Sequence, residues 1–344
     1  MRWCRHRFGD VEPPHDARAG VPKVQPPAEP LYGPYLLMAD ANATRRAAPP
    51  EDDPKRTPAA HLLRSARSRP LLTYFALTFG ISWGGILIAV GLDGLSGMPH
   101  GGETRLPFVY LAMLAGPSVA AILMTGLVQG SAGVRGLLSR PFRWRVGVRW
   151  YAIALLTAPL LLAATLLLLA LFSHDHPPSI VTTSDTVSLL LTGLAVGLVV
   201  GIFEEFGWTG FAVPAARTRH GVFIAGLIVG VAWGAWHTLV MIWGGGTPSS
   251  ALELAILSAQ LFAWLPASRI LMTWMHDRTE SLPVAMLMHA GLTASVLILQ
   301  PAVTGAPLLA FLLAWAGVLW LVVALVAVTD GRRRLRQPLS NRVA

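Results

Sequence analysis

Eight long apolar stretches constrain the fold of this chain more than any other feature of its sequence. They cover roughly residues 71–92, 106–128, 150–172, 187–215, 221–243, 252–274, 282–299 and 307–328. Most have about the 20 residues that a helix needs to cross roughly 30 Å of hydrocarbon. Only 13% of all residues are charged, whereas an ordinary soluble domain has about 25%. We therefore expect an all-α, polytopic membrane helix bundle with about eight transmembrane helices.

The distribution of arginine predicts the orientation of this bundle. Arginines gather before the first stretch, in alternate loops and after the last stretch, whereas the intervening loops contain only Arg105. The positive-inside rule is satisfied at every loop if both termini are cytoplasmic. This bias, together with attraction to anionic membrane lipids, accounts for the net charge of +9. Because no basic helix or aromatic-interleaved basic patch is present, nucleic acid is not expected as a partner.

Three segments are expected along the chain. Residues 1–68 are rich in Pro, Ala, Arg and Asp without an apolar period, which predicts a disordered cytoplasmic tail. Residues 69–330 form the membrane domain, with a motif core at 187–299, and residues 331–344 form a basic cytoplasmic tail. No apolar region follows the basic start, so no signal peptide is expected. The excess of arginine over lysine, with abundant Ala and Gly, favours a GC-rich bacterial genome and hence a bacterial plasma membrane.

Two adjacent glutamates, Glu204 and Glu205, fall inside the fourth stretch. A carboxylate at mid-bilayer costs about 2.5–3.5 kcal/mol, so such residues usually serve a function. The alternative is that the span ends at Phe203 and leaves the pair in water. Apolar residues continue after the pair, and the next basic residue is Arg217. We therefore expect the helix to continue and to bury both glutamates.

Two histidines are expected at similar depths in neighbouring spans. Glu204 lies 15 residues before Arg219 and His237 lies 18 residues after it, which corresponds to roughly 22 and 27 Å along an antiparallel helix pair. His289 follows Arg278 by 11 residues, or roughly 16 Å. The three side chains are thus predicted to meet. Glycines at every fourth position before Glu205 and before His237 favour close helix packing, with the two stripes in contact over part of their length.

These residues support two kinds of chemistry. A glutamate and a histidine can activate water for attack on an amide, while His289 and Thr293, one turn apart, can donate to an oxyanion. Alternatively, Glu204, His237 and His289 hold a divalent metal such as zinc. Cys4 is the single cysteine and no His-Glu-x-x-His occurs, so a zinc–thiolate or zincin-type site is not indicated. The residues alone leave both alternatives open: no cofactor, or a metal.

Three short motifs resemble those of the CPBP family, which contains intramembrane proteases like CAAX prenyl protease 2 and bacteriocin-processing and bacteriocin-immunity relatives. The family pattern is Glu-Glu-x-x-x-Arg, then aromatic-x-x-x-His, then His-x-x-x-Asn. Here the motifs read Glu204-Glu205-Phe-Gly-Trp-Thr209, Trp233-Gly-Ala-Trp-His237 and His289-Ala-Gly-Leu-Thr293. The resemblance implies that Glu204 and His237 activate the water, that His289 and Thr293 form the oxyanion site, and that Glu205 supports them.

Two positions depart from the family pattern. Thr209 stands where the family has Arg, so Glu205 is expected to lack a cationic partner. Thr293 stands where the family has Asn and offers a single hydroxyl donor. Loss of one oxyanion donor can lower a rate by roughly two to three orders of magnitude. If these departures weaken the site, Thr209→Arg and Thr293→Asn should each raise activity.

The resemblance implies an intramembrane endopeptidase that cleaves a peptide or membrane-protein substrate near the cytoplasmic side of the membrane. One alternative is a weak or inactive relative that acts as a bacteriocin-immunity or membrane scaffold protein. Another is an ion-coupled transporter that uses the buried carboxylates. An inverted repeat would favour transport, but the charged motifs occur only in the second half of the chain.

Overall fold

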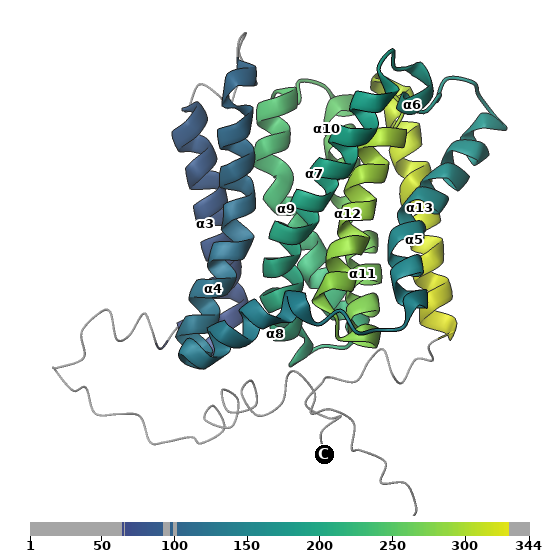
Figure 1. Ribbon diagram of the computed structural model, residues 1–344. Helices are drawn as coiled ribbons and strands as arrows, with labels where there is room; N and C mark the ends of the chain where they lie inside the picture. Colours follow the sequence, from purple (N-terminus) through teal and green to yellow (C-terminus); the bar gives the residue numbers. More distant parts are fainter. Residues whose placement is uncertain (1–63, 65, 92–96, 99–101, 330–344) are drawn as a thin grey trace, which may run out of the picture. The chain divides into compact units, whose positions relative to one another are not determined.

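The structure is a computed structural model that describes residues 64, 66–91, 97–98 and 102–329. These residues form helices and no strand, apart from one isolated antiparallel bridge between Pro178 and Pro301 (Figure 1). The α-helices are α3 (Pro70–Val90), α4 (Leu106–Ser139), α5 (Val148–Ala170), α6 (Ser179–Thr182), α7 (Thr186–Gly207), α8 (Val213–Arg217), α9 (Val222–Gly245), α10 (Ala251–Ser258), α11 (Leu265–Thr279), α12 (Leu282–Leu299) and α13 (Gly305–Thr329). Short 3₁₀ turns, η2 (Gly102–Arg105) and η3 (Arg140–Phe142), flank α4.

Eight helical segments of the described chain are long and apolar enough to cross a membrane, as the sequence predicts. Two of them are composite. The fourth, Thr186–Arg217, joins α7 to α8 through the π-helical turn η4 (Trp208–Ala212), and the sixth, Ala251–Thr279, joins α10 to α11 through the π-helical turn η5 (Ala259–Ala263). Large apolar side chains are exposed along the outer faces of the spans, as expected for contact with lipid. The fold class is therefore confirmed, while the cytoplasmic placement of both termini stays a prediction.

Several helix ends follow from local sequence. Asp185 caps α7 by accepting a hydrogen bond from the backbone N–H of Ser188 at 2.9 Å. Ser250 caps α10 in the same way, accepting from the N–H of Glu253 at 3.2 Å. Helix α11 ends at Glu280, whose φ of 51° is left-handed. The turn to α12 is therefore tight, and α11 and α12 are neighbours.

The glycine stripes allow close helix contacts, but not with each other. An added Cβ at Gly201 would lie 2.5 Å from the carbonyl oxygen of Met286, so the first stripe packs on α12. An added Cβ at Gly230 would lie 2.7 Å from Cα of Pro266, so the second stripe packs on α11. The expectation that the two stripes contact one another is therefore wrong. Instead they form two close pairs, α7 with α12 and α9 with α11. The motif residues lie on three of these helices, α7, α9 and α12, and on η4.

Helix α4 bends at Gly130, whose φ of 70° interrupts the helix. In Figure 1 the part after the bend lies across the lower ends of the other helices. Two hydrogen bonds attach the following turn to the motif helices: Arg140 Nη1 donates to the carbonyl oxygen of Gly210 at 2.6 Å, and Ser281 Oγ donates to that of Arg143 at 3.0 Å. This arginine-rich connection therefore lies directly beneath η4 and the start of α12.

Most of the two predicted tails lies outside the described residues. Only residues 64 and 66–68 of the N-terminal segment are described, and residues 331–344 are not. The described membrane helices begin with α3 at Pro70 and end with α13 at Thr329. The boundaries proposed for the three segments stay predictions.

Candidate active site

The two glutamates lie near the end of α7, on a helix that continues past them into η4 and α8. The exposed fraction is 3% for Glu204 and 0% for Glu205. The alternative in which the span ends at Phe203 and the pair sits in water is therefore wrong. The expectation of two buried carboxylates inside the fourth span is confirmed.

The π-helical turn η4 sets the direction of the residues that follow the glutamates. A π-turn contains one residue more than an α-turn, which rotates the later residues by about 100°. After this rotation Arg217 Nη2 forms a buried ion pair with Asp277 Oδ1 of α11 at 2.7 Å. Arg140 holds a carbonyl of the turn itself, that of Gly210. The part of the span that follows the glutamates is thus fixed against α11 independently of them.

Three side chains from three elements hold the carboxylate of Glu205. Nη1 of Arg269, on α11, donates to both oxygens, at 2.7 Å to Oε1 and 2.8 Å to Oε2. Nδ1 of His289, on α12, lies 2.7 Å from Oε1, and the Thr209 hydroxyl of η4 donates to Oε2. A carboxylate offers about four acceptor positions. Glu205 is therefore fully engaged and has no free oxygen for a water molecule.

Arg269 overturns the expectation that Glu205 lacks a cationic partner. The arginine comes from a different helix, 64 residues along the chain, and both side chains of the pair are 0% exposed. The sequence contains a signal that points to it. Arg269 is the only Asp, Glu, Lys or Arg between Glu253 and Asp277, in an otherwise apolar stretch. A charge in that position almost always has a buried partner.

Glu204 has a different environment, in which indole groups are the donors. Its Oε2 accepts hydrogen bonds from Nε1 of Trp233 at 2.7 Å and Nε1 of Trp208 at 3.2 Å. Within the described residues, no group donates to Oε1 and no cation forms an ion pair with this carboxylate. One oxygen is therefore fixed and the other remains free to accept a hydrogen bond from a ligand.

His237 is held through one ring nitrogen. Its Nδ1 lies 2.9 Å from the carbonyl oxygen of Trp233, one turn earlier on α9. A carbonyl oxygen only accepts, so Nδ1 carries the proton and Nε2 of the neutral ring carries the lone pair. Within the described chain, Nε2 makes no hydrogen bond. His237 therefore presents a second free acceptor close to Glu204.

Trp233 contacts four charged or polar residues of the site, namely Glu204, His237, His289 and Arg269. Besides its bond to Glu204, its ring centroid lies 5.5 Å from that of His237 and 5.2 Å from that of His289. The guanidinium carbon of Arg269 lies 4.4 Å from the same ring, a favourable cation–π distance. The predicted convergence of Glu204, His237 and His289 is therefore observed, and Glu205 joins them through His289. Trp233 opens the second motif, but its role as the connecting side chain was not expected.

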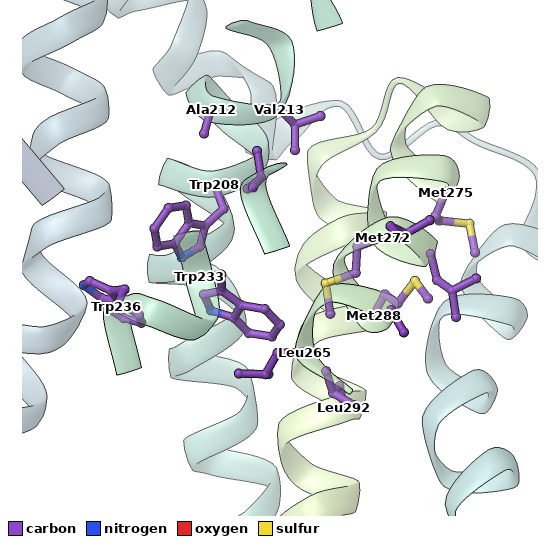
Figure 2. Packing of buried hydrophobic residues seen from close by; sticks show 14 of the residues in the cluster. Trp208, Ala212, Val213, Trp233, Trp236, Leu265, Met272, Met275, Met288 and Leu292 are labelled. Atoms are coloured by element: carbon purple, nitrogen blue, oxygen red, sulfur yellow. The ribbon is translucent and has the colours of Figure 1, made fainter. Parts of the chain in front are cut away.

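Three tryptophans contact this centre, and they belong to a larger cluster of buried aromatic, aliphatic and sulfur-containing side chains. Figure 2 shows Trp208, Trp233 and Trp236 grouped together, with Met272, Met275 and Met288 grouped beside them near Leu265 and Leu292. The rings of Trp208 and Trp236 meet edge to face, with centroids 5.6 Å apart. These apolar side chains keep the polar groups in surroundings of low dielectric constant, where hydrogen bonds and ion pairs are stronger than in water.

Thr293 lies one turn beyond His289 on α12, as the motif spacing predicts. Its side chain is partly exposed, and it makes no hydrogen bond within the described residues. Of the five predicted site residues it is the one that no recorded contact ties to the others. Its proposed role as an oxyanion donor depends on its place on the helix face alone.

The residues do not fit a metal centre well. Among the described residues, no three His, Cys, Asp or Glu side chains are grouped so that they could hold a metal ion. The bonding at the proposed ligands occupies one atom of each, namely Nδ1 of His289 and Oε2 of Glu204. The metal alternative therefore stays a prediction, and no reaction step is derived through a metal.

Fold and site together define a multi-pass membrane protein with a buried glutamate–histidine centre. A sequence model of the family described as Type II CAAX prenyl endopeptidase Rce1-like matches residues 186–295. This range begins with α7 and ends within α12, so it contains all of the motif residues. The chain is also 26% identical, over 94 residues, to CAAX prenyl protease 2 of Methanococcus maripaludis. These matches confirm the resemblance to the CPBP family.

Both matches cover part of the chain. The alignment with the archaeal protein spans 27% of this chain and 35% of the length of that relative. The family match is concentrated on the helices that form the site. Helices α3, α4, α5 and α13 lie outside the range matched by the family.

Proposed function

We propose that the protein is an intramembrane endopeptidase of the CAAX-protease type that hydrolyses a peptide bond near the cytoplasmic side of a bacterial plasma membrane. The observation that carries this proposal is the pairing of two free acceptors, Oε1 of Glu204 and Nε2 of His237, around the indole of Trp233. Two acceptors at one place can bind and deprotonate a single water molecule.

In the proposed reaction, Glu204 acts as the general base, and Nε2 of His237 orients the water by accepting its other hydrogen. Glu204 accepts a proton from water, and the resulting hydroxide attacks the carbonyl carbon of the scissile amide. The carbonyl oxygen becomes an oxyanion, which His289 and Thr293 stabilise by hydrogen bonds. The proton passes to the leaving amine as the carbon–nitrogen bond breaks. Because the Glu205 carboxylate accepts from Nδ1–H of His289, the ring can donate to the oxyanion through Nε2–H only as an imidazolium, and Glu205 then fixes the direction of that bond.

The position of the site near the end of α7 and the similarity both support a substrate class. We propose a peptide or membrane protein whose cleaved segment enters from the cytoplasmic interface and reaches the buried site beside η4. The name of the archaeal relative refers to prenylated substrates, and a bacterial leader peptide or bacteriocin-like peptide is an alternative of the same chemical type. Membrane lipids are the expected surroundings, and nucleic acid is not an expected partner.

A non-catalytic relative, such as an immunity or scaffold protein, is the second candidate. Thr293 favours it, because a hydroxyl replaces the longer amide and no recorded contact ties it to the site. The absence of an arginine at position 209 does not support a non-catalytic role, because Arg269 provides the cation that pairs with Glu205. No observation favours a transporter, since Glu205 is fixed by three partners rather than free to exchange protons.

The test is cleavage by the purified protein in proteoliposomes. Fluorescent peptides of one sequence would be offered with a prenyl group, with an acyl leader and unmodified. We expect cleavage by the wild type, and loss of cleavage in His237→Ala with normal membrane insertion. A chelator should leave the rate unchanged, whereas inhibition reversed by zinc would favour a metalloprotease. Cleavage of no peptide by the wild type, or full activity in His237→Ala, contradicts the proposal.

A further inference from the structure

The cation beside Glu205 comes from an unexpected direction. Position 209 already points at this carboxylate, because the Thr209 hydroxyl donates to Oε2 from one turn further along the same span. The positive charge nevertheless arrives from α11, through Arg269. Two places in the fold therefore reach the same buried carboxylate, and in this chain the uncharged residue occupies the nearer one.

We propose that Arg269 replaces an arginine at position 209, so that the counter-ion of Glu205 has moved from the helix of the glutamates to α11. Arg269 then acts as a positioning residue: it holds Glu205, and Glu205 holds Nδ1 of His289. The catalytic consequence rests on the proposed function, whereas the placement of the charge does not.

Two residues of helix α9, Gly230 and Trp233, face the side chain of Arg269. Gly230 faces the beginning of the side chain, where an added Cβ would lie 3.0 Å from Cβ of Arg269. Trp233, one turn later on the same helix, lies beneath the guanidinium, with 4.4 Å between its ring centroid and Cζ. A small residue therefore makes room for the stem and an aromatic ring supports the charge. This second observation, on a different helix, indicates an accommodated side chain rather than an incidental contact.

The two positions exclude each other physically. Glu205 already accepts from Arg269, Thr209 and His289, which uses about all the acceptor positions of a carboxylate. One carboxylate balances one guanidinium, and a second guanidinium in this fully buried place would have no anion. Thr209→Arg alone should therefore harm the protein. This expectation is the opposite of the one drawn from the motifs, where an arginine at this position raises activity.

The experiment is a double-mutant cycle on the full chain in detergent and proteoliposomes. The variants are Arg269→Met, Thr209→Arg and the double variant. We expect each single variant to lower the unfolding midpoint by about 10 °C, as for a broken buried ion pair. The double variant should recover at least half of that loss. Arg269→Lys, which keeps the charge but forms fewer hydrogen bonds, should show an intermediate midpoint.

Arg217 provides the matched control, because it is also a buried arginine in an ion pair with a carboxylate of another element. Arg217→Met should destabilise the protein, and Thr209→Arg should not rescue it. Rescue of both arginine variants would indicate general stabilisation and would overturn the proposal. A double variant no more stable than the worse single variant, or a Thr209→Arg variant more stable than the wild type, would also overturn it.

The positioning role has its own readout. In spectra of protein with ¹⁵N-labelled histidine, the Nδ1–H signal of His289 should shift in Arg269→Met and return in the double variant. In the peptide assay, kcat should fall at least tenfold in Arg269→Met with KM nearly unchanged, and recover in the double variant. If Arg269→Met does not fold, the yield of monodisperse double variant replaces the midpoint, and no gain in yield overturns the proposal.

Failure of this inference is distinguishable from failure of the proposed function. If the wild type cleaves no peptide but the double variant regains stability and the His289 signal, the charge has moved as proposed and the protease assignment is wrong. If the wild type cleaves and the double variant regains nothing, the protease assignment stands and Arg269 does not replace an arginine at position 209.

Discussion

Glu204 and Glu205 are neighbours in sequence but belong to two different halves of the site. The Glu205 half is ionic and saturated, with a guanidinium, an imidazole and a hydroxyl on one carboxylate. The Glu204 half has two indole donors on one oxygen and leaves the other oxygen free. The difference arises because successive residues of a helix point about 100° apart, so that one faces α11 and α12 and the other faces the indoles. It separates a structural carboxylate from a reactive one.

We expect the largest loss of stability when the ion pair between Glu205 and Arg269 is broken. Glu205→Gln leaves the guanidinium of Arg269 buried without an anion, and removal of one partner of a buried pair costs about 3–5 kcal/mol. We expect a strongly lowered unfolding midpoint and little active protein. Thermal unfolding followed by tryptophan fluorescence measures the loss. A variant as stable as the wild type would contradict the view that Glu205 is a structural carboxylate.

Glu204→Gln should lower the rate of peptide cleavage rather than the stability of the protein. Glu204→Gln keeps an oxygen for both indoles, so the unfolding midpoint should change little. The peptide-cleavage rate should fall by about 10²–10⁴-fold, the range of a general base. Glu103→Gln, at an exposed glutamate of η2, is the control and should leave both quantities unchanged. Equal losses of stability in Glu204→Gln and Glu205→Gln would contradict the conclusion that only Glu205 has a structural role.

A smaller effect is expected at the indole that joins the two halves. Trp233→Phe keeps an aromatic ring but removes the hydrogen bond to Glu204. A hydrogen bond to a charged group contributes about 1.5–3 kcal/mol, which corresponds to roughly 10- to 150-fold in kcat. Trp236→Phe is a matched control, because no partner is recorded for the Nε1 of Trp236 among the described residues. Similar losses in the two variants would show that the indole N–H of Trp233 does not hold Glu204.

The smallest effect is expected at Thr293. Thr293→Val removes the hydroxyl and changes the volume little. Because this hydroxyl makes no hydrogen bond within the described residues, the unfolding midpoint should not change. Because no contact holds this hydroxyl in place, we expect it to contribute less than a preorganised oxyanion donor and about as much as an ordinary neutral hydrogen bond, about 0.5–1.5 kcal/mol. The kcat should therefore fall by roughly 2- to 10-fold. An unchanged kcat would remove Thr293 from the oxyanion site, and a gain in kcat for Thr293→Asn would show what the hydroxyl lacks.

The sequence predicts the fold and the members of the Glu204 half well. Apolar length gives the spans directly. Counting residues from the arginines of the loops places Glu204 and His237 at compatible depths, together with His289 of the Glu205 half. All of these inferences depend on distances within single helices, which a sequence specifies.

The sequence predicts the contacts between helices less well. The assignment of glycine stripes to partners was wrong, because a stripe shows that a helix is approached closely but not by which neighbour. Arg269 was overlooked because its partner lies two spans earlier, although an isolated charge in an apolar stretch is itself a signal. The π-helical turn η4 leaves no mark in hydropathy, yet it decides which way Arg217 points.

The separation of Glu205 from Arg269 also affects biosynthesis. The carboxylate precedes its cation by 64 residues along the chain, so the fourth span leaves the ribosome before the sixth. Two unpaired glutamates carry an insertion cost of roughly 5–7 kcal/mol. An arginine at position 209 would enter with the glutamates and neutralise one of them at once. We therefore expect stable insertion of the fourth span to depend on the arrival of α11.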